Sequence, residues 1–252
     1  MRGMRFALRS GMTAAALSLF LLRNPLFASS PLEGFPRVVL WAWERPEDLR
    51  FLAGRDAGVA FLAVTATLSG GAVLTRRRRE PLLVDPATPV MAVVRVETVR
   101  GFKPALSQGQ REAVVRAALE AARLPRVAAV QIDGDAAASE RAFFRGVLTD
   151  LRARLDPRLG LSFTALASWC AGDRWLGGLP VDEAVPMLFQ MGADAAAIRT
   201  RAAEGRLAPE CRAAVGFSTE EPAAPTRGRV YLFSPEPWTE TSFERELSRI
   251  SR

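Results

Sequence analysis

Apolar residues along this chain form short runs that alternate with stretches of helical spacing. Eight runs of five to nine residues are bounded by glycine, proline or charged residues, which is typical of buried strands. The predicted strands cover residues 37–43, 59–67, 90–97, 127–133, 161–167, 184–191, 213–218 and 229–233. Near-continuous apolar strands of this kind indicate a parallel sheet that is covered on both faces.

Helices are predicted between most of these strands. Apolar side chains recur at three- and four-residue steps in the two longest intervening stretches, which is the pattern of a helix with one buried face. Pro46, followed by Glu47 and Asp48, is typical of a helix start, and Gly54 of a helix end. Helices are therefore predicted over residues 46–54, 108–123, 139–155, 194–206 and 239–250.

One stretch, residues 69–85, interrupts this alternation. It contains a glycine pair, a β-like AVLT segment and four consecutive arginines, Arg76–Arg79. We expect an excursion from the sheet with a solvated arginine run, and binding of an anionic polymer or lipid surface is the alternative.

Eight strands and their helices within about 220 residues predict a (β/α)8 barrel as a single domain over residues 31–252. An open doubly wound sheet is the alternative architecture. Because the chain contains neither a GxGxxG nor a Walker motif, nucleotide binding has no support, and we expect no cofactor.

Residues 1–30 have the pattern of a secretory signal peptide. An arginine-rich start precedes the apolar run Ala14–Leu22 and the small-residue exit at Ala28 and Ser29. The run is shorter than the roughly 20 apolar residues that span a bilayer. We expect a periplasmic or secreted protein, and an uncleaved N-terminal anchor is the alternative route to a membrane.

The amino-acid composition excludes several kinds of binding and catalytic site. The formal net charge is +7, but the arginines outside the leader are spread along the chain, so nucleic-acid binding is not expected. The chain contains no histidine, which excludes a Ser-His-Asp triad, a Cys-His pair and the common histidine zinc sites. Acid–base chemistry would rest on carboxylates, with Tyr231, Lys103 or a cysteine as minor options, and no metal site is predicted.

The two cysteines, Cys170 and Cys211, are candidates for a disulfide. An even number of cysteines in an exported protein favours such a bond. Two buried free thiols are the alternative, because the sequence does not give the separation of the Cα atoms.

Carboxylates and tryptophans follow the predicted strands. In a barrel, residues just after each strand meet at one face, where the active sites of such folds lie. Tryptophan rings stack on sugar faces and carboxylates bind hydroxyls or transfer protons, so this set predicts a polysaccharide site. The candidate catalytic residues are Asp133, Asp135, Glu44 and Glu97, and the candidate substrate-binding residues are Trp43, Trp169, Gln190 and Thr65. Thr67, Ser218, Glu220, Ser234 and Glu236 belong to the same predicted rim.

Each candidate also has a structural interpretation. Asp133 could pair with an arginine, Asp135 could cap the next helix, and Glu44 could form a surface ion pair. Trp43 and Trp169 could be core residues beneath loops.

Several separated segments resemble one bacterial family, the domain of unknown function 3142. They are VVLWAWERPEDLRFL, GVAFLAVT, VQIDGDA, LSFTALASWCAGDRWL and LPVDEAVPMLFQMG, and the resemblance covers nearly the whole chain from Arg37 to about Trp238. The resemblance implies no established activity.

The fourth strand also resembles that of family 18 glycoside hydrolases, the chitinase-like barrels with a D-x-D-x-E signature. Asp133 and Asp135 match the two aspartates, whereas Ala137 occupies the place of the proton-donating glutamate. The resemblance implies a barrel that acts on glycans. Either Glu44 or Glu97 would supply the acid for hydrolysis, or the protein is a non-catalytic barrel that binds a glycan or a protein partner. The sequence leaves the oligomeric state open.

Overall fold

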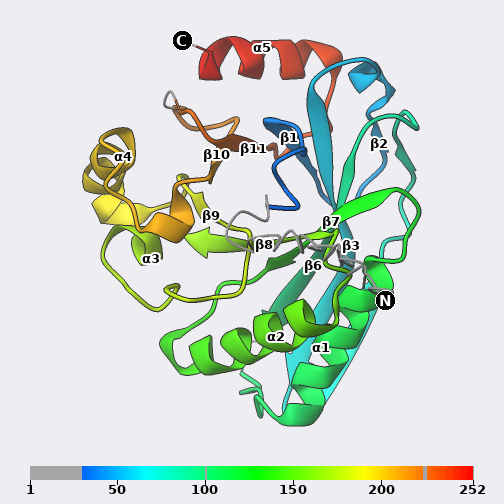
Figure 1. Cartoon of the computed structure of the whole chain (residues 1–252), viewed down its shortest axis with the longest axis vertical. Helices are drawn as coiled ribbons and strands as arrows, with labels where there is room; N and C mark the ends of the chain where they lie inside the picture. The colour runs from blue at the N-terminus through cyan, green and yellow to red at the C-terminus, as the bar shows by residue number, and fades with distance from the viewer. Residues whose placement is uncertain (1–29, 100, 224–225, 252) are drawn as a thin grey trace, which may run out of the picture.

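The computed structural model describes residues 30–99, 101–223 and 226–251, so the predicted leader lies outside the described residues except for Ser30. Eight parallel strands in the described ranges close into a barrel, because β1 pairs with both β11 and β3 (Figure 1). This confirms the predicted (β/α)8 barrel. The barrel strands are β1 (Val38–Ala42), β3 (Ala57–Ser69), β6 (Val90–Thr98), β7 (Val127–Asp133), β8 (Gly160–Leu166), β9 (Glu183–Met187), β10 (Ala214–Ser218) and β11 (Arg229–Phe233).

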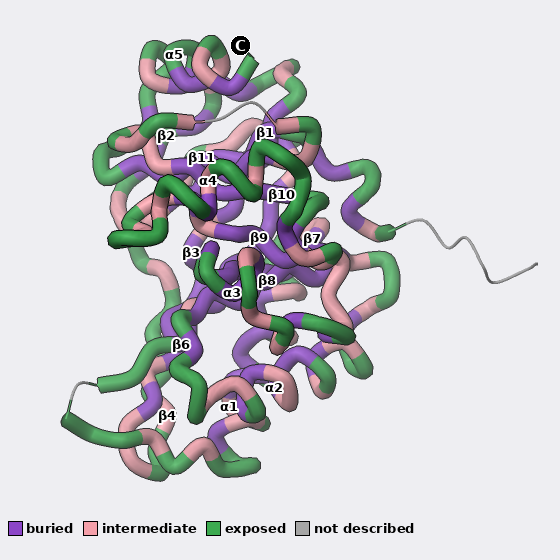
Figure 2. The backbone as a smooth tube through the Cα atoms, turned by 90° about the vertical axis from the view of Figure 1, so that its left-hand side faces the viewer, coloured by how far each residue is buried: buried purple, intermediate pink, exposed green. Residues whose placement is uncertain are grey.

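The strands form the buried centre of the molecule (Figure 2). Their inward side chains include a chain of hydrogen bonds between polar groups. Trp41 Nε1 donates to Gln131 Oε1 at 2.9 Å, and Gln131 Nε2 donates to Ser162 Oγ at 3.0 Å. Ser162 Oγ and the Tyr231 hydroxyl both donate to Oε1 of buried Glu183, at 3.1 and 2.5 Å. Buried polar groups that are satisfied in this way fix the packing of the barrel interior.

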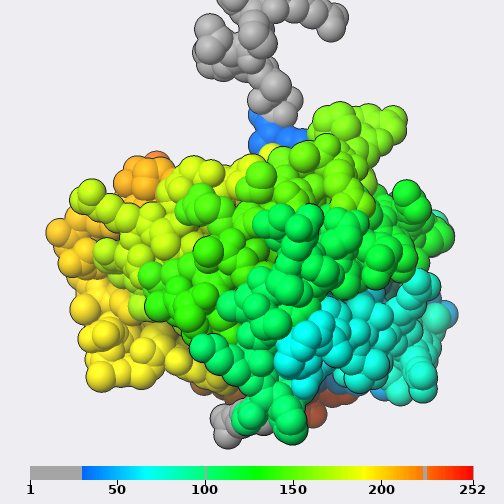
Figure 3. Space-filling view, turned by 90° about the horizontal axis from the view of Figure 1, so that it is seen from below, coloured from blue at the N-terminus to red at the C-terminus, as the bar shows by residue number. Residues whose placement is uncertain are grey.

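Five helices in the described part of the chain cover the barrel. The longest two, α1 (Gln108–Ala121) and α2 (Arg141–Arg154), lie side by side, and the antiparallel strand β4 (Ala72–Arg77) lies next to α1. In Figure 3 the two helices, in green, occupy the centre of the face, with yellow segments from around residue 200 at its left. The others are α3 (Ala167–Ala171), α4 (Ala195–Ala203) and α5 (Glu240–Ile250). Single 3₁₀ turns cover Ala138–Glu140, Gly192–Asp194 and Pro209–Cys211. No helix separates β10 from β11 in the described residues.

The helix predicted over residues 46–54 is wrong. The chain instead forms the short strand β2 (Glu47–Asp48), which pairs with β5 (Leu82–Leu83), followed by one 3₁₀ turn at Arg50–Leu52. Glu47 is buried and accepts hydrogen bonds from Arg45 Nε at 2.7 Å and from the Trp238 backbone N–H at 2.9 Å. These tertiary contacts outweigh the local signals for a helix start.

Residues 30–36 close the amino end of the barrel. Leu32 packs against Gly160, the first residue of β8, and Phe35 packs against Gly58 near the start of β3; a Cβ at Gly160 would lie 2.4 Å from Leu32 Cδ2. Arg229 donates to backbone oxygens of this segment and pairs with Glu183. These contacts cover the amino end of the barrel.

Cys170 and Cys211 form a disulfide, with Cα atoms 5.9 Å apart and a sequence separation of 41. The bond joins α3 to the 3₁₀ turn at Pro209–Cys211, and both cysteines are buried. Within the residues that the structure describes, no helix has the length and apolar character needed to cross a membrane.

Candidate functional site

Asp133 ends β7 at the open end of the barrel, where the apolar strand predicted the start of a site. Its Oδ1 accepts a hydrogen bond from Thr164 Oγ1 at 2.8 Å, and its Oδ2 accepts one from Arg95 Nη1 at 2.9 Å. Burial raises the pKa of the Asp133 carboxyl above its usual range, and this effect outweighs the opposing effects of Arg95 and Thr164. Asp133 is therefore held in a fixed position and retains its proton to a higher pH than an exposed aspartate.

A cavity of about 480 Å³ opens beside Asp133 at the carboxyl ends of the strands. This volume is within the roughly 300–1,000 Å³ of small-molecule sites. The residues that line it are Trp43, Arg95, Asp133, Asp135, Leu166, Ala167, Ser168, Met187, Phe189, Gln190, Met191, Asp194, Ile198 and Phe233. The structure thus brings four of the sequence candidates together here: Trp43, Asp133, Asp135 and Gln190.

Aromatic rings form a continuous set beneath and beside this cavity. Trp41 and Trp43 have ring centroids 4.3 Å apart, and Trp41 stacks on Phe233 at 5.4 Å. Phe233 in turn lies 5.0 Å from Phe189. Trp43, Phe189 and Phe233 line the cavity itself, so it presents flat apolar surfaces next to carboxylates.

Two candidates lie elsewhere. Trp169 is buried in α3, stacked on Phe163 and in edge contact with Trp175, so its ring belongs to the core outside the barrel. Glu44 pairs with Arg76 and does not line the cavity. Both side chains therefore lie outside the cavity that contains Asp133.

Glu97 and Thr65 lie on the neighbouring strands. Glu97 accepts a hydrogen bond from Thr67 Oγ1 at 3.1 Å and lines a second, smaller cavity. Thr65 is buried at the level of Arg95, its partner in the register of β3 and β6. Neither residue lines the cavity that contains Trp43.

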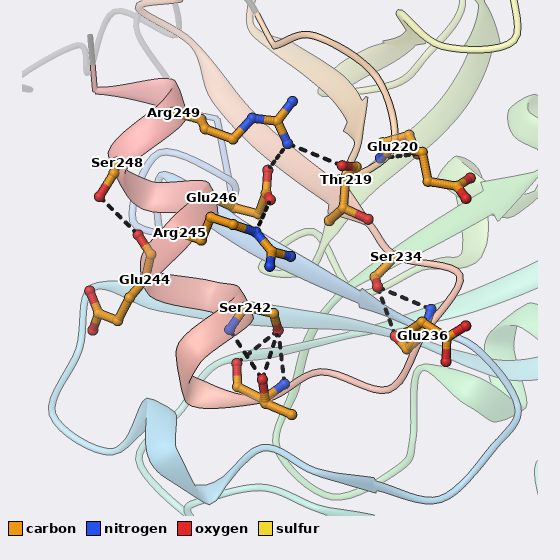
Figure 4. A network of polar contacts seen from close by, with 12 residues as sticks. Thr219, Glu220, Ser234, Glu236, Ser242, Glu244, Arg245, Glu246, Ser248 and Arg249 are labelled. Carbon is orange, nitrogen blue, oxygen red and sulfur yellow. Dashed lines mark hydrogen bonds and ion pairs between the residues drawn. The ribbon is translucent and has the colours of Figure 1, made fainter.

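The predicted rim residues after β10 and β11 make local contacts instead. Ser234 Oγ donates to the Glu236 backbone oxygen at 2.8 Å, and the Glu220 N–H donates to Ser218 Oγ at 3.2 Å. Figure 4 shows Glu220, Ser234 and Glu236 near α5, where Arg249 pairs with buried Glu246. These residues hold the loops after β10 and β11 in place.

Sequence reasoning missed Arg95, Thr164 and Asp194. Arg95 is a charged residue inside the apolar strand predicted at residues 90–97, before the terminal Glu97, and a charge at such a position indicates a polar contact that the sequence could have revealed. Asp194 lies in the 3₁₀ turn after β9, a strand that only β8 separates from β7, and no motif marked it. The described residues contain no group of three or more cysteines and carboxylates that could hold a metal ion.

Comparison with solved structures identifies the fold. The proposed chitinase A from Streptomyces coelicolor is 13% identical, with a TM-score of 0.53 over 85% of this chain and 97% of that one. The chain shares the (β/α)8 barrel fold of that protein. At this identity the likeness concerns the fold alone.

Two further structures match more loosely. The spore cortex-lytic enzyme SleL from Bacillus cereus is 14% identical, with a TM-score of 0.48 over 73% of this chain and 51% of SleL. The chitinase domain of the spore coat protein CotE from Clostridium difficile is 14% identical, with a TM-score of 0.41 over 65% of this chain and 53% of that one. The present chain thus spans about half the length of each.

No family model and no curated protein matches this sequence. The resemblance to the domain of unknown function 3142 therefore stays a prediction.

Proposed function

We propose that the protein is an exported carbohydrate-active barrel that binds a polysaccharide in the cavity beside Asp133. The observation that carries the proposal is the convergence of Trp43, Phe189 and Phe233 with carboxylates in one cavity at the open end of the barrel. Sugar rings present apolar faces to aromatic rings and hydroxyl edges to carboxylates and amides. Asp135 and Gln190 supply those polar groups.

The barrel fold and two features typical of exported proteins support the same proposal. A protein named chitinase A shares the barrel over nearly its whole length, which favours a polysaccharide as the ligand class. The disulfide between Cys170 and Cys211 is of a kind that persists in oxidising compartments, and the pattern of residues 1–30 is that of a secretory signal.

A glycan array on the purified protein, followed by titration of the glycans that bind, tests this proposal. We expect Trp43→Ala to weaken binding about tenfold, or about 1.4 kcal/mol, because a stacking surface is lost. Phe102→Ala is the matched control, since Phe102 is an exposed aromatic residue that does not line the cavity. Binding that is unchanged in Trp43→Ala, or the absence of any glycan ligand, would end the proposal.

Hydrolysis of a glycosidic bond is a second candidate function, favoured by the raised pKa of Asp133. Glycoside hydrolases pair a protonated carboxyl with an ionised one, and Asp135 lines the same cavity as Asp133. Glu140 is a third carboxylate near this position, because its Oε2 accepts a hydrogen bond from the Ala137 backbone N–H at 2.9 Å. It lines the smaller cavity together with both aspartates.

Release of reducing ends from a polysaccharide that binds tests this second function. Asp133→Asn keeps the shape of the side chain but cannot donate or accept the proton, so we expect turnover to fall at least about 100-fold. Asp150→Asn, on α2 and paired with Arg111 at the surface, is the control and retains turnover. A wild-type protein that binds glycan but releases no product is a binding protein only.

A further inference from the structure

A cavity of about 590 Å³ lies outside the barrel, against the outer face of β10. In a (β/α)8 barrel a helix follows each strand and covers it, but no helix follows β10 in the described residues. Val215 and Phe217 of β10 form an apolar wall of this cavity, between the end of α4 and the residues just before β11. The lining residues are Leu188, Ala202, Ala203, Glu204, Gly205, Leu207, Cys211, Arg212, Ala214, Val215, Phe217, Thr226, Arg227 and Gly228.

An adjoining cavity of about 530 Å³ has a more cationic lining. Leu207 and Arg212 line both cavities, so the segment 207–212 lies at their boundary. The disulfide from Cys211 to Cys170 ties this segment to α3, and the Ala208 N–H donates to the Cys170 backbone oxygen at 2.8 Å. The residues that line only this second cavity are Cys170, Ala171, Gly172, Asp173, Arg174, Leu176, Gly177, Arg201, Arg206, Ala208, Pro209 and Glu210.

Positive charge exceeds negative charge in this second cavity. Of its charged side chains, Asp173 is neutralised by Arg141, and Arg206 by Glu204. Glu210 is the one other acid in the lining. Three lining arginines form no ion pair with a described residue: Arg174, Arg201 and Arg212. This side of the boundary therefore attracts an anion.

Arg212 is placed to hold such an anion next to the apolar cavity. Its Nε donates to the Leu207 backbone oxygen at 2.9 Å, which orients the guanidinium. The four N–H donors of its terminal nitrogens engage no described acceptor, and two of them can bind two oxygens of one phosphate or carboxylate. Arg227, which lines the apolar cavity, is exposed and has no ion-pair partner in the described part of the chain.

We propose that these two cavities bind a lipid with an anionic head group, with the acyl chain in the apolar cavity and the head group at Arg212. The apolar wall favours a hydrocarbon chain and the arginines favour an anion, and an anionic lipid has both parts in one molecule. The volume of the apolar cavity is within the roughly 300–1,000 Å³ of small-molecule sites. No residue lines both this pair of cavities and the cavity beside Asp133, so the lipid site is independent of the proposed glycan site.

Calorimetric titration with three probes tests the site, with each lipid below its critical micelle concentration. The probes are myristoyl lysophosphatidylglycerol, myristoyl lysophosphatidylcholine and glycerol 3-phosphate. We expect the phosphatidylglycerol probe to bind at least about tenfold more tightly than the phosphatidylcholine probe, because it has a net negative charge and the same chain. Glycerol 3-phosphate should bind at least about 100-fold more weakly, because it has no chain to bury.

Two variants with matched controls test the location. Ala203→Trp, at an exposed position that lines the apolar cavity, should weaken binding of the phosphatidylglycerol probe at least about tenfold. Ala197→Trp, exposed on the same helix outside both cavities, retains binding. Arg212→Gln should remove the preference for the anionic probe, whereas Arg116→Gln, exposed on α1, retains it. Ala203→Leu is a smaller filling variant should Ala203→Trp fail to fold.

The outcomes separate the parts of the proposal. Equal binding of the two lysolipids to the wild type overturns the anionic head group, and glycerol 3-phosphate that binds as tightly as they do overturns the acyl chain. Unchanged binding in folded variants of both Ala203 and Arg212 overturns the location. If no probe binds, the lipid site is wrong, and a dimer in sedimentation velocity that Ala203→Trp dissociates would assign these cavities to a second copy of the chain.

Discussion

At the scale of single residues, Asp133 shows why a carboxyl at the end of a buried strand is chemically distinct. Burial raises its pKa, while Arg95 and Thr164 oppose that shift without cancelling it. A carboxyl whose pKa is higher in the folded than in the unfolded protein binds its proton more tightly in the folded state. Its contribution to stability is therefore largest at low pH and is lost as pH rises through the folded-state pKa.

This gives a prediction for the free energy of unfolding. The difference between wild type and Asp133→Asn should shift against the wild type as pH rises from about 4, the usual pKa of aspartate, because the variant cannot titrate. Urea unfolding of both proteins between pH 4 and pH 8 measures it. A difference that is constant over this range, or that shifts in favour of the wild type as pH rises, would contradict a raised pKa.

The sequence identified some of the residues around Asp133 and not others. Asp133, Asp135 and Trp43 follow apolar runs, and strand ends can be recognised from a sequence. Trp169 follows a strand as well, but α3 begins at once and turns its ring against Phe163. Nothing in the local pattern distinguishes a tryptophan at the mouth of a barrel from one packed outside it.

At the scale of elements, the turn from β7 to α2 depends on Gly134. A Cβ at this position would lie 2.6 Å from Phe144 Cε1 and 3.3 Å from the Val96 backbone oxygen. Phe144 is buried against Phe143 and Phe163, so its ring has little room to move. The close approach of α2 to β7 fixes where Asp133 and Asp135 lie.

Gly134→Ala is accordingly expected to lower the free energy of unfolding by about 1–3 kcal/mol, the usual cost of overpacking a core. Gly71→Ala is the matched control, because a Cβ there meets no atom within 4 Å and the backbone conformation is an ordinary one. Denaturant unfolding compares the two. Equal free energies of unfolding of the two variants would contradict this prediction and show that the Phe144 ring moves aside without loss of stability.

Elements were predicted well where apolar runs define them. All eight barrel strands were expected, and the bounds of β7 and β11 agree with the predicted ranges. The segment 46–54 failed because its structure depends on Pro81, Leu82 and Leu83, which lie about 35 residues further along the chain. Local helix signals contain no information on such a distant partner.

At the scale of the whole molecule, the disulfide stabilises a region where helices cover the barrel sparsely. Only the loop 219–228, with positions 224 and 225 not described, joins β10 to β11, and α3 has five residues. The bond between Cys170 and Cys211 closes a loop over 41 positions and links the connection after β8 to the approach to β10. A closed loop of this length lowers the conformational entropy of the unfolded chain and so stabilises the folded state.

Replacing both cysteines with serine should lower the free energy of unfolding by about 4 kcal/mol on the loop-entropy account. Thermal and urea unfolding of the double variant against the oxidised wild type measure this loss, and the reduced wild type serves as the control for the substitutions themselves. If the free energy of unfolding falls by well below about 1 kcal/mol in the double variant and in the reduced wild type, packing alone stabilises this side of the barrel.

The central claim is that a glycan occupies the cavity lined by Trp43, and the five tryptophans report on it directly. In a ¹H–¹⁵N NMR spectrum, the indole N–H signal of Trp43 should shift when a glycan ligand is added, because its ring lines the cavity. Trp41 is buried beneath Trp43, with ring centroids 4.3 Å apart, so its signal should shift less. The signals of Trp169, Trp175 and Trp238, which lie outside it, should stay in place. Shifts confined to Trp169 and Trp175, or no shift at a saturating glycan concentration, would contradict the account.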